Sequence, residues 1–199
     1  MENTAPEAQY LRLNTEQNAL DYLERAAIFI KETVGDIKTW KWVMIALHGA
    51  LYGFAIAASA GTNPSNSVMT KRDKLIGFWD ALKLCQDPDH MNMLIHSKPL
   101  ILSESQKESI RFMKNHLRNG FEHFTPKLWA SEIHGMPQIA IDVLEVTRFL
   151  ALETNTYIHL ADEEYNLVDS LVHQSIAFIR ETALYKEMKL AEELYAQNS

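Results

Sequence analysis

The sequence VMIALHGALYGFAIAASA, residues 43–60, contains no Asp, Glu, Lys or Arg residue. A helix that crosses a membrane needs about 20 apolar residues. This run is shorter, and it contains His48, Ser59 and two glycines. We therefore predict a central helix of a soluble bundle, apolar on all sides because neighbouring helices cover it. A membrane-spanning helix is the alternative.

The two glycines of this run, Gly49 and Gly53, form a G-x-x-x-G step. Small residues at this spacing let a second helix approach closely. The step predicts tight helix packing, with packing across a dimer as an alternative. Trp40 and Trp42 begin the same helix, and aromatic side chains of this size usually fill a core or an interface.

Outward from this run, hydrophobic residues recur at helical spacing. Glycines (7) and prolines (6) are scarce, and they cluster where helices should end. The predicted helices cover residues 16–34, 37–60, 71–85, 103–120, 138–153 and 161–197. The main predicted loops are residues 61–70 and 86–102, and residues 1–14 form a flexible N-terminus. We predict an all-α fold, a single-domain bundle of five to six helices over residues 1–199.

Composition narrows the function. The chain has 199 residues and a net charge of -7, which argues against broad, nonspecific binding to nucleic acid. Its one cysteine, Cys85, excludes an internal disulfide and a cysteine-rich zinc cluster, and it fits a reducing compartment. The first residues show no secretory signal. These features predict a cytoplasmic protein.

Residues 114–124, KNHLRNGFEHF, gather basic and polar groups at the end of a predicted helix. Arginine supplies a permanent charge in a planar fork, and histidine exchanges a proton near neutral pH. Asparagine can orient either group by hydrogen bonding. Such a cluster is suited to handling a phosphate group.

Within this segment, Arg118-Asn119-Gly120-Phe121-Glu122-His123 resembles the R-x(4–6)-H motif of the HEPN superfamily, in which a polar residue often follows the arginine. The resemblance implies an all-α bundle with the motif at a helix end. Many HEPN members are metal-independent ribonucleases, often the toxin of a toxin–antitoxin pair or part of a defence system. They commonly dimerise so that two motifs face one cleft. Other members are non-catalytic modules that bind nucleotide, RNA or a protein partner.

The resemblance implies a catalytic set of Arg118, Asn119 and His123, with no metal and no cofactor. A ribose 2′-hydroxyl would attack the adjacent phosphate, with His123 as general base or acid. Arg118 would stabilise the phosphorane, and Asn119 would position the arginine or the phosphate. The expected partners are RNA or a nucleotide, a second copy of the chain and an antitoxin.

The motif sets a geometric requirement. On an uninterrupted helix, Arg118 and His123 would lie about 140° apart. We therefore predict that the helix ends near Gly120, so that His123 turns back under Arg118. The alternative is that a two-fold axis brings them together.

Further basic residues accompany the motif, and we predict that they bind substrate. Arg111 and Arg118 are seven residues apart and would share one face of a regular helix, with Lys114 near that face. The predicted substrate-binding residues are Arg111, Lys114, His116 and Lys127.

Overall fold

The computed structural model describes residues 9–61, 64–94, 96–123, 126, 128–154 and 158–197. The predicted all-α class is confirmed: this part of the chain contains no β-strand, and its only strand-like pairing is an isolated bridge between Met69 and Leu75. Residues 1–8, part of the predicted flexible N-terminus, lie outside the described residues.

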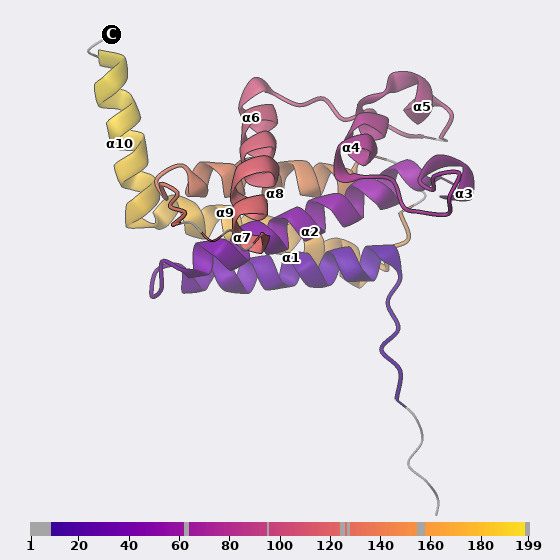
Figure 1. Cartoon of the computed structure of the whole chain (residues 1–199), viewed down its shortest axis with the longest axis horizontal. Coiled ribbons are helices and arrows are strands. Elements are labelled where there is room, and N and C mark those ends of the chain that lie inside the picture. The colour runs from indigo at the N-terminus through magenta and orange to yellow at the C-terminus, as the bar shows by residue number, and fades with distance from the viewer. Residues whose placement is uncertain are drawn as a thin grey trace, which may run out of the picture.

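Helices α1 (Thr15–Glu32) and α2 (Thr39–Ala60) lie side by side along the long axis of the molecule (Figure 1). Asn14 begins α1 with a capping box, in which its Oδ1 accepts from the Gln17 amide at 2.7 Å. Helix α2 is buried along most of its length, with Phe54 and Leu51 fully enclosed. The predicted central helix is therefore present.

The G-x-x-x-G step acts within the chain. A Cβ on Gly53 would lie 2.6 Å from the Cβ of Ala19, and one on Gly49 would lie 2.5 Å from the ring of Tyr22. Both neighbours belong to α1. The two glycines thus let α1 lie close against α2, which accounts for the step without a second copy.

We expect Gly53→Ala to destabilise the protein more than Gly49→Ala. At Gly53 the added methyl meets the Cβ of Ala19, with the Ala19 backbone behind it, so the two helices must separate. Overpacking of this kind costs about 1–3 kcal/mol, against a gain of about 1 kcal/mol in helix propensity. At Gly49 the obstacle is the partly exposed Tyr22 ring, which can turn aside. Urea unfolding of both variants measures the difference, and equal stabilities would contradict the close approach at Gly53.

Helices α8 (Met136–Leu152) and α4 (Phe78–Gln86) pack on α2, and α9 (Asp162–Glu181) packs on α1 and α8. In the described part of the chain, α2 is the one helix long and apolar enough to cross a membrane. Its most apolar window of 18 residues has a mean hydropathy of 1.7, and 67% of that window is buried inside the fold.

The predicted helix over residues 71–85 starts too early. Helix α4 begins at Phe78, after a tight turn in which the Thr70 hydroxyl accepts from the amides of Arg72 and Lys74. Asp73 in this turn has a φ of 52°. These local bonds compete with a helix, as is common for threonine and aspartate.

The two predicted main loops each contain a short helix. Residues 61–70 include α3 (Pro64–Ser67), and residues 86–102 include α5 (Pro88–Asn92). At α5, the Asp87 carboxylate accepts from the Asp89 amide at 2.9 Å and Pro88 occupies the first turn. Both segments were too short for a periodic pattern to reveal.

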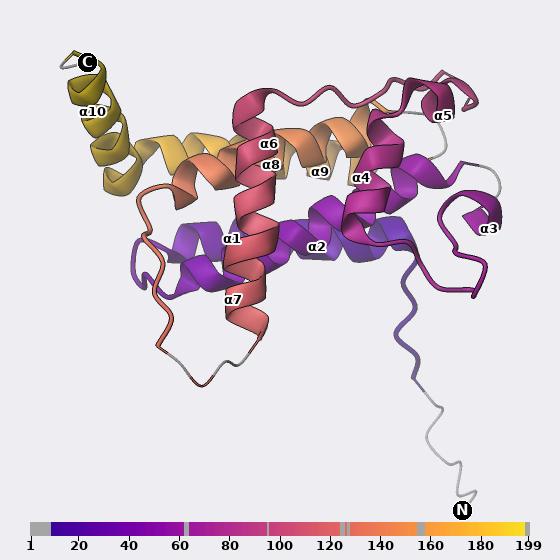
Figure 2. The same cartoon turned by 45° about the horizontal axis from the view of Figure 1, so that its top comes forward.

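The predicted single helix over residues 161–197 is wrong, because it breaks at Thr182. This residue has an extended backbone (ψ 148°), and its hydroxyl accepts from the Tyr185 amide at 3.3 Å. Threonine therefore caps a new helix, α10 (Ala183–Gln197). Helix α10 projects away from the bundle, as Figures 1 and 2 show, and Met188 is its one buried residue among those described.

Candidate functional site

The motif lies on one continuous rod that crosses the α1–α2 pair (Figure 2). It consists of α6 (Glu104–Phe112), the π-helix η1 (Met113–Arg118) and α7 (Asn119–Glu122). Ser103 begins the rod with a capping box, and its hydroxyl accepts from the Gln106 amide at 3.2 Å. The rod continues to Glu122, two residues beyond the predicted end.

A buried carboxylate holds the rod against α8. Asp142, only 4% exposed, accepts hydrogen bonds from the hydroxyls of Ser105 (2.8 Å) and Ser109 (2.5 Å) on α6. Gln138 donates to its other oxygen at 2.9 Å. Hydrogen bonds to a charged group are stronger than neutral ones, so this cluster fixes the position of the rod that carries the motif.

The π-helical turn brings three predicted site residues together. Because its hydrogen bonds span five residues, Lys114 is aligned with Asn119. Lys114 Nζ donates to Asn119 Oδ1 at 3.3 Å, and Arg118 Nη1 donates to the same oxygen at 3.2 Å. One amide oxygen therefore holds two cations side by side.

Arg118 is tied on its other side by an ion pair between Nη2 and the Glu122 carboxylate. Its Nε is buried and has no hydrogen-bond partner among the described residues. The side chain is about a quarter exposed (26%), so part of it is accessible from solvent.

His123 does not turn back under Arg118 within the chain. The rod does not end at Gly120, and His123 leaves α7 exposed, with an extended backbone (φ -95°, ψ 109°). Among the described residues, the side chain of Arg118 bonds to Asn119 and Glu122, and no hydrogen bond or ion pair joins it to His123. Gly120 does not act as the predicted helix breaker, because the rod continues through it to Glu122. Gly120 instead leaves space for the Trp129 ring, since a Cβ there would lie 2.6 Å from that ring.

The remaining predicted substrate-binding residues are spread around the rod. His116 is exposed and stacks on Phe112, with ring centroids 4.9 Å apart. Arg111 is exposed on α6. It precedes the π turn, so the shared face expected of a regular helix with Arg118 does not apply. Lys127 lies outside the described residues.

A pocket of about 410 Å³ opens on the side of Arg118 that faces α1 and α2. Its polar and aromatic wall comes from three helices, α1, α2 and α7, and from Arg118. The lining residues are Thr15, Asn18, Tyr22, Ile45, His48, Gly49, Tyr52, Gly53, Ile56, Leu75, Arg118 and Glu122.

His48, which belongs to the apolar run 43–60, is a functional candidate outside the predicted motif. Its ring stacks on Phe78 with centroids 4.7 Å apart, and its Nε2 is buried without a partner in the described part of the chain. Burial, followed by the charges of Arg118 and Lys114, lowers the pKa of His48 to about 3. Burial and Arg118 also lower the pKa of Lys114, against the effect of Glu122. The pocket therefore contains a neutral histidine beside two cations.

No group of three metal-ligating side chains occurs among the residues that the structure describes. His90, in the segment 86–102, places its Nε2 3.0 Å from the Ser59 carbonyl oxygen. Cys85 is buried, and this burial raises the pKa of its thiol to about 12.

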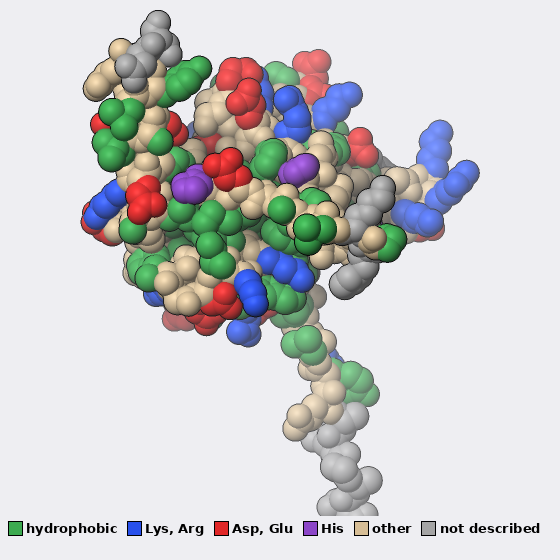
Figure 3. Space-filling model, turned by 60° about the vertical axis from the view of Figure 1, so that its left-hand side comes forward, with side chains coloured by type: hydrophobic (Ala, Val, Ile, Leu, Met, Phe, Trp, Pro, Cys, Tyr) green, Lys and Arg blue, Asp and Glu red, His purple; other side chains and the backbone are tan. Residues whose placement is uncertain are grey.

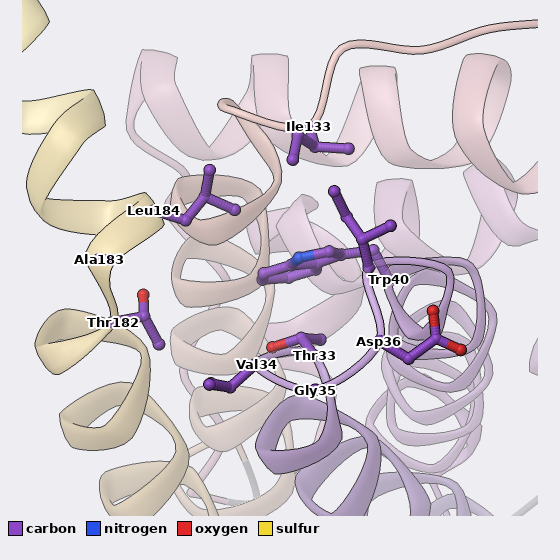
Figure 4. A pocket seen from close by; sticks show the side chains of 10 residues that line it. Thr33, Val34, Gly35, Asp36, Trp40, Ile133, Thr182, Ala183 and Leu184 are labelled. Atoms are coloured by element: carbon purple, nitrogen blue, oxygen red, sulfur yellow. The ribbon is translucent and has the colours of Figure 1, made fainter.

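A second hollow, of about 540 Å³, lies between the α1–α2 turn and the start of α10. Figure 3 shows this side of the molecule, where hydrophobic side chains gather next to α10. In Figure 4 the Trp40 indole lies across the hollow, between Ile133 and Thr33, and the Asp36 carboxylate lies to one side. This hollow is mainly apolar, and it lacks the paired charges found around Arg118.

Comparison of the chain with protein-family models, with curated proteins and with solved structures gives no match.

Proposed function

We propose that this protein is a HEPN-like, metal-independent endoribonuclease that acts as a homodimer. The observation that carries the proposal is the hydrogen-bonding of Lys114 and Arg118 to the single Oδ1 of Asn119. This arrangement holds two cations where one phosphate could bridge them. It also makes Asn119 a positioning residue, in line with the motif resemblance.

In the proposed reaction, a ribose 2′-oxygen bonds to the adjacent phosphorus and the bond from phosphorus to the 5′-oxygen breaks. His123 takes the proton of the 2′-hydroxyl or gives one to the departing 5′-oxygen. Arg118 stabilises the negative charge that develops on the phosphorane. The products are a 2′,3′-cyclic phosphate and a 5′-hydroxyl end.

We propose a homodimer because no hydrogen bond or ion pair joins Arg118 and His123 within the described part of one chain. His123 is exposed and lies just beyond the rod, so it is available to the Arg118 of a second copy. We extend the proposal to a cytoplasmic toxin or defence component whose activity an antitoxin partner restrains.

The direct test is incubation of RNA with the purified protein in excess chelator. The expected result is cleavage that leaves a 2′,3′-cyclic phosphate, which resists phosphatase until acid opens the ring. RNA that stays intact in excess chelator, and also when divalent metal is supplied instead of chelator, would contradict the proposed activity.

Recovery of the protein from the soluble fraction without detergent tests the expectation that it is not a membrane protein.

A non-catalytic HEPN-like binding module is the second candidate. The ion pair between Arg118 and Glu122 favours it, because a guanidinium already neutralised by a carboxylate is a weaker stabiliser of a phosphorane. This candidate predicts that the protein binds RNA or a nucleotide, or a protein partner, through the same residues and leaves the RNA intact.

A further inference from the structure

The pocket beside Arg118 contains two buried polar atoms without a partner in the described structure, His48 Nε2 and Arg118 Nε. Leaving a buried donor unsatisfied is costly, and native proteins rarely do so. Arg118 Nε is always a donor, and the neutral His48 ring can donate from Nε2. Both side chains line the pocket, so its wall has hydrogen-bonding capacity that the described part of the chain does not use.

The pocket wall is suited to a flat ring. Tyr22, His48 and Tyr52 contribute aromatic rings, and Ile45, Ile56 and Leu75 contribute apolar surface. Tyr22 is 39% exposed, so it has surface left for stacking. The volume of about 410 Å³ falls within the range of roughly 300–1,000 Å³ that is typical of small-molecule sites.

We propose that this pocket binds the guanine base of the nucleotide that precedes the cleaved phosphate. The inference rests on the proposed ribonuclease function and deepens it, because it assigns a base preference to the same site. The base would lie against Tyr22 and Tyr52, and its ribose phosphate would extend past Arg118 toward Lys114.

Glu122 is the residue that selects guanine. Its carboxylate lines the pocket and only accepts hydrogen bonds, with two oxygens that each have spare capacity. On its Watson–Crick edge guanine presents two adjacent donors, N1–H and the N2 amino group, which match a carboxylate. Adenine and cytosine present an amino group beside an acceptor, and uracil presents one donor between two acceptors.

Arg118 binds the phosphate of the same nucleotide, as the proposed reaction requires, while Glu122 binds the base. The Nη1 and Nη2 groups of Arg118 are held by Asn119 and Glu122, so the guanidinium is fixed next to the base site. The Arg118–Glu122 pair thus offers donors and acceptors side by side, and the ligand would share both partners of the ion pair.

Binding can be measured without any cleavage. We expect isothermal titration calorimetry to show that guanosine 3′-monophosphate binds roughly 5- to 150-fold more tightly than the adenosine, cytidine and uridine 3′-monophosphates. Glu122→Gln should abolish this preference, since an amide presents one donor and one acceptor. Glu108→Gln, an exposed glutamate on the same rod, is the matched control and should keep it. Tyr22→Leu should weaken all four nucleotides by removing the stacking surface.

The outcomes separate the two proposals. Guanosine-selective binding together with intact RNA would overturn the ribonuclease function and leave the guanine pocket standing. Cleavage after every base, with equal binding of the four monophosphates, would overturn the pocket and leave the ribonuclease. Absence of binding by all four nucleotides would also overturn the pocket, as would a guanosine preference that survives Glu122→Gln.

Discussion

Replacing Arg118 by alanine is expected to lower the rate of metal-independent RNA cleavage by about 10²- to 10³-fold, the usual effect of removing one preorganised charge or donor at a developing oxyanion. The side chain is held on both sides, by Asn119 Oδ1 and by Glu122. It is therefore fixed before the substrate arrives, which is the condition for a large electrostatic contribution. Single-turnover kinetics on a labelled RNA measures the loss.

Two matched variants make this prediction specific. Arg180→Ala removes an exposed arginine from α9, outside the site, and should leave the rate unchanged. Arg118→Lys keeps the charge but loses the planar fork that reaches Asn119 and Glu122 together, so an intermediate rate is expected. Full activity of Arg118→Ala, with the fold intact by circular dichroism, would remove Arg118 from the reaction.

His123→Ala should lower the rate by about 10²- to 10⁴-fold, the range for a general acid or base. If Arg118 of one copy works with His123 of the other, mixing the Arg118→Ala and His123→Ala proteins restores one complete site in each mixed dimer. Recovered activity on mixing is the expected result, and His173→Ala, an exposed histidine on α9, serves as the control. If the two variants stay inactive when mixed, either Arg118 and His123 act within one chain or they do not act together in the reaction.

Lowering the pH from 7 to 5 is expected to reduce the free energy of unfolding by about 2 kcal/mol through His48 alone. The pKa of this histidine is about 3 in the folded protein, against an ordinary value of 6.5. Between these values the unfolded chain binds more protons than the folded one, so stability falls as the pH falls through 6.5 toward 3. The cause is burial first, and then the positive charges of Arg118 and Lys114.

Urea unfolding at pH 7 and pH 5 tests this linkage in the wild type and in His48→Gln. Glutamine does not titrate, so the variant should lose most of the pH-dependent difference, whatever the substitution costs at pH 7. His173→Gln changes an exposed histidine and should keep the wild-type pH dependence. An unchanged pH dependence in His48→Gln would mean that His48 is not held neutral by its surroundings.

The sequence predicted those parts of the fold that local patterns determine. Asn14 and Ser103 cap helices close to the predicted starts at residues 16 and 103, and the apolar run 43–60 forms the central helix. The break at Thr182 was not predictable from periodicity, because hydrophobic residues continue on both sides of it. The break occurs because the Thr182 hydroxyl caps the next helix. Whether a threonine caps a helix or continues one depends on its tertiary surroundings.

The candidate site was predictable only as a linear cluster. Spacing placed Lys114, Arg118 and Asn119 near one another, but the hydrogen bonds to Asn119 depend on a π turn that no propensity indicates. His48 is 70 residues before Arg118, and its place beside the arginine follows from how the rod crosses α2. The one signal in the sequence was the position of His48, directly before the G-x-x-x-G step. Because helices pack closely at such a step, a polar ring there indicates a specific role.

The π turn has a consequence for changes in chain length. A π-helical turn contains one residue more than an α-helical turn, so it is equivalent to an α-helix with a one-residue insertion. Deleting one residue from α6 would rotate the residues that follow it by about 100° about the helix axis. This rotation would turn Leu117 away from the core. Deleting the exposed Asn115 would instead convert the turn to a regular one and leave both flanks facing as they do now. This segment is therefore where the rod can best tolerate being one residue shorter.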